Sequence, residues 1–142
     1  MPVKLIAIDV DGTLLDSTAQ LPENNRRVLH EAAVHGIEIV LATGRSFHHT
    51  RELATQMPAQ TVLILNNGSL VKDRTGLTLA SHGLPAETAR YIVNETRAAR
   101  EGAAAIFDRD DVRQFLCERI DWTHPHRKQY YLQHHAWITQ VP

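Results

Sequence analysis

Three short apolar runs, separated by two segments of helical periodicity, constrain the fold of this chain more than any other feature. The runs occupy residues 3–8, 37–42 and 61–65, and each predicts a strand. The first is nearly continuous, which is typical of a parallel strand buried on both faces. Residues 22–36 and 46–58, which lie between the runs, carry apolar side chains at helical spacing. They begin with Pro and Ser, which are common at helix starts. We therefore predict an α/β fold with a parallel sheet and right-handed crossovers.

The pattern changes after Gly68, where the regular alternation of strands and helices stops. The expected elements are a β-hairpin over residues 69–82, a helix over 85–102 and a second hairpin formed by 103–107 and 112–117. The stretch from Glu118 onward is polar and rich in histidine, and its pattern predicts no element. We expect a core unit over residues 1–82 and the start of a second α/β unit over residues 83–142.

Composition limits the partners and the location of the chain. With 15 Lys and Arg against 16 Asp and Glu, there is no basic field to hold a polyanion, so we expect no nucleic-acid binding. Hydrophobic residues make up 43% of the chain, which is enough for a core, but no run approaches the roughly 18–20 apolar residues of a membrane span. Cys117 is the only cysteine, and the N-terminus enters a predicted strand directly, so we expect a cytoplasmic protein without disulfides.

Polar or glycine-containing turns follow all three predicted parallel strands. They are residues 9–13 (Asp-Val-Asp-Gly-Thr), 43–45 (Thr-Gly-Arg) and 66–68 (Asn-Asn-Gly). Because ligands bind at the carboxyl ends of the strands in open parallel sheets, we expect these turns to form one site.

Asp9 and Asp11 determine the chemistry that this site favours. Two carboxylates directly after a buried strand suit Mg²⁺, which prefers oxygen ligands and is commonly shared with a substrate phosphate. One carboxylate would attack phosphorus while the other passes a proton to the leaving oxygen. Gly12 would allow a sharp turn, and Thr43 would hydrogen-bond a phosphate oxygen. The alternatives are a strand-end turn capped by the aspartates and, for Thr43, a simple helix N-cap.

Three motifs resemble those of one enzyme family. Residues 8–16 (Ile-Asp-Val-Asp-Gly-Thr-Leu-Leu-Asp) resemble the first motif of the haloacid dehalogenase (HAD) superfamily of phosphatases, and residues 42–45 resemble the second. Residues 66–68 and the hairpin after them resemble the Cof-type branch, which carries a large C2-type α/β cap between its second and third motifs. The resemblance implies a partial Rossmann-like parallel sheet core, followed by the beginning of that cap.

Roles for individual residues follow from the resemblance. Asp9 would be the nucleophile that forms a phospho-aspartate, and Asp11 would be the general acid and base. Both would bind Mg²⁺, Asp11 through its backbone carbonyl. Thr43 and Gly44 would bind the transferring phosphoryl group. The implied substrate-binding residues are Arg45 and Asn67, for which local turn chemistry is an equally strong alternative.

Two family motifs have no match in the sequence. The third supplies a lysine, but Lys72 and Lys128 lie in the predicted hairpin and the polar tail. The fourth has a Gly-Asp-x-x-x-Asp pattern, and the acidic residues near the second hairpin lack its glycine; they are Asp108, Asp110 and Asp111. We therefore expect the N-terminal half of a phosphatase, with little activity alone. We also expect an unpaired sheet edge, on the third-strand side of the core or in the cap sheet, that promotes self-association.

The resulting hypothesis is a Mg²⁺-dependent phosphomonoester hydrolase that acts on small phosphorylated metabolites, such as sugar phosphates or nucleotide-like phosphates. One alternative is a phosphomutase of the same fold, which would pass the phosphoryl group to a second sugar hydroxyl. Another is a catalytically inactive truncated fragment that binds a partner. The histidines of the tail fit no compact zinc pattern, so we expect them to be solvated.

Overall fold

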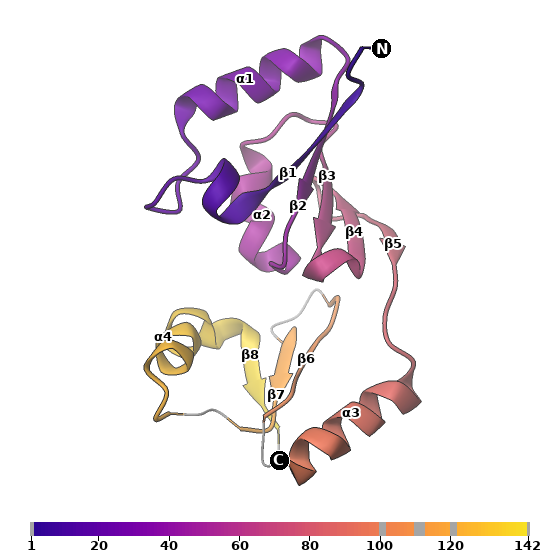
Figure 1. Cartoon of the computed structure of the whole chain (residues 1–142), viewed down its shortest axis with the longest axis vertical. Coiled ribbons are helices and arrows are strands. Elements are labelled where there is room, and N and C mark those ends of the chain that lie inside the picture. The colour runs from indigo at the N-terminus through magenta and orange to yellow at the C-terminus, as the bar shows by residue number, and fades with distance from the viewer. Residues whose placement is uncertain (1, 100–101, 110–112, 120–121, 142) are drawn as a thin grey trace. The chain divides into compact units, whose positions relative to one another are not determined.

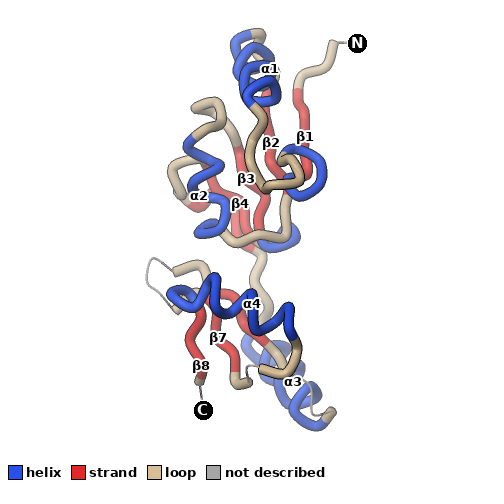
Figure 2. The backbone as a smooth tube through the Cα atoms, turned by 90° about the vertical axis from the view of Figure 1, so that its left-hand side faces the viewer, coloured by secondary structure: helices blue, strands red, loops and turns tan. Residues whose placement is uncertain are grey.

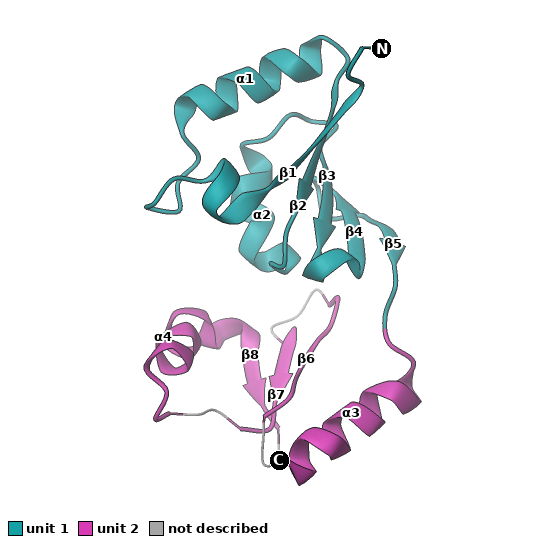
Figure 3. Ribbon diagram, in the orientation of Figure 1, with its two compact units in different colours: residues 1–83 teal, residues 84–142 magenta. Residues whose placement is uncertain are grey.

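The computed structural model describes residues 2–99, 102–109, 113–119 and 122–141 (Figure 1). The chain divides into two compact units, residues 1–83 (unit 1) and 84–142 (unit 2), which are coloured separately in Figure 3. Asp110 and Asp111, noted above for their sequence context, lie outside the described residues.

Unit 1 contains a five-stranded sheet in the order β1-β2-β3-β4-β5. The strands are β1 (Leu5–Asp9), β2 (Glu38–Ala42), β3 (Val62–Leu65), β4 (Leu70–Asp73) and β5 (Thr78–Ser81). The first three strands are parallel, and β4 and β5 continue the sheet as an antiparallel hairpin. The mixed α/β architecture and the parallel order predicted from the sequence are confirmed.

Two helices connect the parallel strands. α1 (Glu23–Val34) follows Pro22, and the chain leaves it through Gly36, which has a φ of 77° that glycine adopts readily. α2 (Phe47–Thr55) follows Ser46. Ser46 occupies the position predicted for an N-cap, but its side chain makes no capping bond and its hydroxyl lies 3.3 Å from Nδ1 of His49.

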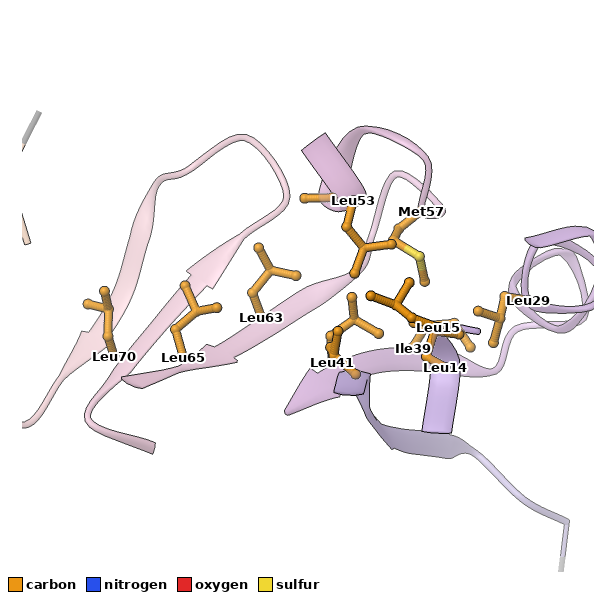
Figure 4. Packing of buried hydrophobic residues seen from close by; sticks show 12 residues of the cluster. Leu14, Leu15, Leu29, Ile39, Leu41, Leu53, Met57, Leu63, Leu65 and Leu70 are labelled. Atoms are coloured by element: carbon orange, nitrogen blue, oxygen red, sulfur yellow. The ribbon is translucent and has the colours of Figure 1, made fainter. Parts of the chain in front are cut away.

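The hydrophobic core of unit 1 lies between the sheet and these helices. Figure 4 shows Leu41, Leu63 and Leu65 on the side of the sheet where Leu53 and Met57 lie, at the C-terminal half of α2 and just beyond its end. All five side chains are buried. The core therefore holds the carboxyl ends of the parallel strands in fixed relative positions.

The expectation that the first strand is buried on both faces is wrong. β1 alternates between exposed and half-buried residues, and Leu5 keeps 48% of its surface exposed. The reason is that β1 is an end strand, which pairs only with β2. β2 has a strand on each side and is buried on both faces, whereas β1 has a neighbouring strand on one side only, so its side chains are less covered. On the third-strand side of the core, where a free edge was expected, β3 itself is not the edge: it lies between β2 and β4, and the end strand on that side is β5.

The β4–β5 hairpin packs against the start of α2. Lys72 is 5% exposed, and its Nζ donates to the Gly76 carbonyl (3.0 Å) and to Thr78 Oγ1 (2.8 Å). The same ammonium lies 5.4 Å from the centre of the Phe47 ring. Lys72 is therefore buried in the hairpin, as a tertiary contact of unit 1.

The described residues of unit 2 form two α-helices and a three-stranded sheet. Its elements are α3 (Ala86–Ala98), β6 (Ala104–Ile106), β7 (Phe115–Cys117), α4 (Pro125–His134) and β8 (Ile138–Gln140). β6 and β7 pair antiparallel as the second predicted hairpin, whereas β7 and β8 pair in parallel. The sequence pattern missed α4 and β8, and Figure 2 shows α4 in front of β7 and β8.

Few side chains of unit 2 are buried. Among its described residues, only Gln114 and Cys117 are buried. Burial raises the pKa of the Cys117 thiol, and Cys117 packs as a small apolar residue. An open groove of about 1040 Å³ lies between α4 and the sheet, lined in part by Phe115, Tyr130 and Ile138. No helix in the described stretches is both long and apolar enough to cross a membrane.

Candidate active site

The register of the parallel strands brings the three predicted turns to one edge of the sheet. Asp9 at the end of β1 pairs with Ala42 at the end of β2, and Ala42 pairs with Ile64 near the end of β3. Because the strands run in the same direction, the segments that follow them leave the sheet at the same edge. Asp9, Asp11, Thr43, Gly44, Arg45 and Asn67 all lie there.

The turn after β1 is anchored by apolar side chains. Val10 and Leu14 are buried, and the Leu15 amide donates to the Val10 carbonyl at 3.1 Å, which closes the turn. Gly12 has a φ of 77°, a conformation that few other residues adopt without strain. Asp9 and Asp11 are exposed in this turn. The alternation of buried apolar and exposed acidic residues therefore presents both carboxylates to solvent.

Thr13 contacts the predicted nucleophile directly. Its Oγ1 donates a hydrogen bond to Oδ2 of Asp9 at 3.3 Å. The sequence analysis gave Thr13 no role of its own. Its position four residues after Asp9, in a short turn, could have indicated a contact between the two side chains.

Backbone hydrogen bonds join the turns after β2 and β3. The Thr43 amide donates to the Ile64 carbonyl at 2.9 Å, and the Asn67 amide donates to the Thr43 carbonyl at 3.3 Å. The Asn66 amide donates to the Arg45 carbonyl at 3.1 Å. Residues 43–45 are therefore tied to the end of β3 and to the turn that follows it.

Thr43 is not the N-cap of the following helix, because α2 begins at Phe47 after Ser46. Thr43 is buried, and its Oγ1 accepts a hydrogen bond from the Arg45 amide at 3.2 Å. The hydroxyl retains its proton for donation to another acceptor. The N-cap alternative for Thr43 is therefore excluded. The hydroxyl of Thr43 is able to donate a hydrogen bond to a bound oxyanion.

Asn66 and Asn67 both adopt left-handed backbone conformations, with φ of 49° and 55°. Asn tolerates this region better than most residues. Asn66 has a buried Oδ1 without a hydrogen-bond partner within the described part of the chain. The sequence analysis assigned no function to Asn66. The Asn-Asn-Gly run could have indicated an unusual backbone turn here, since asparagine and glycine are the residues that most often adopt positive φ.

Asp11 and Arg45 form an ion pair between the first and second turns. Arg45 Nε donates to Oδ2 of Asp11 at 2.9 Å, and a terminal guanidinium nitrogen donates to Oδ1 at 2.5 Å. The Arg45 side chain is 27% exposed and that of Asp11 is 59% exposed. Both carboxylate oxygens of Asp11 are therefore engaged by one guanidinium group, a contact that the sequence analysis did not anticipate.

The oxygen atoms at this edge suit a hard divalent cation. The Asp9 carboxylate and the Asp11 backbone carbonyl are the ligand types that Mg²⁺ prefers. The described residues contain no group of three or more His, Cys, Asp or Glu side chains that could hold a metal. A Mg²⁺ ion here would thus rely on water and substrate oxygens for its remaining ligands, which is common for this ion.

Comparisons with known proteins point to one family. The family model for haloacid dehalogenase-like hydrolases matches residues 6–135. Among curated proteins, the 5-amino-6-(5-phospho-D-ribitylamino)uracil phosphatase YcsE of Bacillus subtilis is 42% identical over 71 residues, which cover 50% of this chain and 28% of YcsE. Phosphatase YwpJ of the same organism is 39% identical over 74 residues, which cover 52% of this chain and 26% of YwpJ.

The fold comparison agrees with the sequence comparison. The solved structure of BT1666, a phosphatase of the HAD superfamily from Bacteroides thetaiotaomicron, matches with a TM-score of 0.78 and 25% identity. That match covers 99% of this chain and 50% of BT1666. The chain therefore spans about half the length of this structure and less than a third of the length of the curated relatives named above.

Proposed function

The chain belongs to the haloacid dehalogenase-like hydrolase family, with relatives of the Cof type, and we propose that it carries the nucleophile side of a Mg²⁺-dependent phosphomonoester hydrolase site. The observation that carries this proposal is the alignment of Asp9, Ala42 and Ile64 in adjacent strands. It brings two carboxylates, a threonine, a glycine and an arginine to one edge of the sheet. This edge is where α/β proteins bind their ligands.

In the proposed reaction, a carboxylate oxygen of Asp9 attacks the phosphorus atom of the substrate. A bond forms between that oxygen and phosphorus while the bond to the ester oxygen breaks, and Asp11 gives a proton to the departing alkoxide. Water then attacks the phosphorus of the phospho-aspartate and passes a proton to Asp11. This second step releases inorganic phosphate and restores the Asp9 carboxylate.

The chain's own groups support the proposed reaction in three ways. Thr13 orients Asp9 through its hydroxyl, and the buried Thr43 would donate to an oxygen of the transferring phosphoryl group. Gly44 has no side chain to cover its amide, so an anion could approach that amide closely. When bound by the Asp9 carboxylate and the Asp11 carbonyl, Mg²⁺ would neutralise part of the phosphate charge.

The proposed substrates are small phosphorylated metabolites such as sugar phosphates. Support comes from the relative YcsE, whose name specifies a phosphorylated ribityl compound. We further propose that a lysine and a third carboxylate come from polypeptide beyond these 142 residues. The described part of the chain offers no three-residue acidic or histidine cluster that would complete the metal site.

Self-association and a cytoplasmic location belong to the same proposal. Self-association is supported by the position of β1 at the end of the sheet and by its exposed Leu5. The location is supported by the single cysteine, which needs no oxidising compartment for a disulfide within the chain.

Phosphate release tests the proposed function. The chain is assayed with Mg²⁺ on p-nitrophenyl phosphate and a panel of sugar phosphates, beside the Asp9→Asn variant and Glu87→Gln on α3 as a charge-matched control. Because the proposed lysine and third carboxylate lie outside these residues, we expect only slow release from this chain, which disappears in Asp9→Asn and persists in Glu87→Gln. Equal release from all three proteins would contradict a role for Asp9. No release from the unsubstituted chain would contradict hydrolysis by this chain alone, and an isomeric sugar monophosphate without free phosphate would favour a phosphomutase.

A further inference from the structure

Arg45 is held at three points, each on a different turn of the proposed site. Its amide donates to Oγ1 of Thr43, and its carbonyl accepts from the amide of Asn66. Its guanidinium group donates two hydrogen bonds to Asp11. One residue therefore links the carboxyl ends of all three parallel strands.

The hydrogen bonds of the Arg45 amide and carbonyl fix the backbone from which its side chain extends. Most of the side chain is buried, since only 27% of its surface is exposed, and burial restricts the rotamers of a long side chain. The Asp11 side chain is 59% exposed and would otherwise sample several rotamers in solvent. The ordered guanidinium group thus determines where the Asp11 carboxylate lies.

The two-point contact leaves Asp11 able to act. A carboxylate offers about four lone-pair positions on its two oxygens, and the guanidinium group uses one on each. A proton bound at one of the remaining positions can face the oxygen of a leaving group, so protonated Asp11 can donate it while both oxygens keep their contacts with Arg45. A planar fork matches a carboxylate at two points, whereas the ammonium group of lysine is a single point charge that does not fix the carboxylate plane.

We propose that Arg45 is a positioning residue that acts through Asp11, by fixing the orientation in which Asp11 transfers a proton to the leaving oxygen. This inference rests on the proposed function, because it assigns Asp11 the role of general acid. It differs from the substrate-binding role that the family resemblance implies for Arg45. The two roles predict different kinetic effects, because a positioning residue affects proton transfer and a substrate ligand affects binding.

Two substrates separate these roles. Glucose 6-phosphate releases an alkoxide that needs a proton, whereas p-nitrophenyl phosphate releases a stable phenolate that does not. We expect Arg45→Met to lower kcat on glucose 6-phosphate by about 10- to 100-fold, with a much smaller change on p-nitrophenyl phosphate and KM within about twofold. Arg45→Lys should restore little of the lost kcat because it cannot form the fork.

Asp11→Asn and the double variant complete the cycle. If Arg45 acts through Asp11, adding Arg45→Met to Asp11→Asn has little further effect on glucose 6-phosphate hydrolysis. Arg27→Met is the matched control, because Arg27 forms an ion pair with Glu31 at 2.7 Å on α1, away from the site. A rise in KM on both substrates, or an equal loss of kcat in the Asp11→Asn background, would overturn the positioning role.

A nuclear magnetic resonance measurement separates failure of this inference from failure of the proposed function. If the unsubstituted chain releases no phosphate, the function proposed for this chain fails, and the Nε–H signal of Arg45 decides the inference. A signal protected from solvent exchange, and lost in Asp11→Asn but retained in Glu31→Gln, supports the positioning contact. A signal that exchanges equally fast in all three proteins would refute it.

Discussion

The side chain of Asn67 lies against the backbone of Gly44, so closely that a Cβ atom on residue 44 would be 2.8 Å from Oδ1 of Asn67. The two residues belong to different turns, and the Asn67 amide also donates to the carbonyl of Thr43. Glycine at position 44 thus allows the second and third turns of the site to meet.

Replacing Gly44 by alanine should therefore destabilise unit 1. The new methyl group would force the amide end of the Asn67 side chain to move, and because that side chain can rotate, we expect a loss of about 1 kcal/mol of unfolding free energy, the low end of the range for overpacking. Urea denaturation measures the change. Gly83→Ala is the control, because a Cβ atom there would meet nothing within 4 Å. The double variant with Asn67→Gly should recover most of the loss, since glycine also accepts the φ of 55° at that position. Equal stability of Gly44→Ala and Gly83→Ala would contradict the close packing.

The β4–β5 turn should give the chain a pH-dependent contribution to stability. Oδ1 of Asp73 accepts hydrogen bonds from the Thr75 hydroxyl and from the amides of Thr75, Gly76 and Leu77. These bonds, led by that of the Thr75 hydroxyl, lower the pKa of Asp73 in the folded chain.

Because the folded pKa of Asp73 is lower than the unfolded pKa, the stabilising contribution is present above the unfolded value of about 3.9 and is lost as the pH falls through the folded value. Asp73→Asn keeps an acceptor oxygen but removes the charge. Urea midpoints of both proteins between pH 6 and pH 2 should differ most at pH 6 and converge in acid. A difference that stays constant over this range would show that ionisation of Asp73 does not stabilise the turn.

Hydrogen exchange should divide the chain into a protected and an unprotected unit. β2 has three consecutive buried residues, Ile39, Val40 and Leu41, whereas the described strands of unit 2 contain one buried residue, Cys117. Few buried apolar contacts imply low local stability, so amides of β7 should exchange many times faster than those of β2. Equal protection of the two strands would show that unit 2 is stabilised by contacts that its buried residues do not account for.

A charged side chain introduced on the edge strand β1 should weaken self-association of the chain. Sedimentation at increasing protein concentration should reveal self-association, because β1 presents an apolar strand with a free pairing edge. Leu5→Lys should weaken this association, since charged residues on edge strands oppose further pairing. Val34→Lys is the matched control on α1, where Val34 is 85% exposed. A monomer at all concentrations, or an equal effect of both variants, would contradict association through β1.

The sequence by itself determined the order of the elements in unit 1 and the position of the candidate site. Apolar runs and helical periodicity are local patterns, and each depends only on residues that are close in the chain. The same holds for the turn around Gly12, whose alternation of apolar and acidic residues separates the buried anchors from the exposed carboxylates. In unit 2, the pattern was too polar to reveal α4, in which no residue is buried.

Only the tertiary structure decided which side chains meet. Asp11 and Arg45 are 34 residues apart, and their contact depends on a crossover that places β1 beside β2 in one register. The exposure of Leu5 was likewise hidden, because an apolar run looks the same whether its strand lies in the middle of a sheet or at its edge. Local periodicity predicts how a segment folds, whereas its neighbours depend on how distant segments pack, and that information is spread over the whole chain.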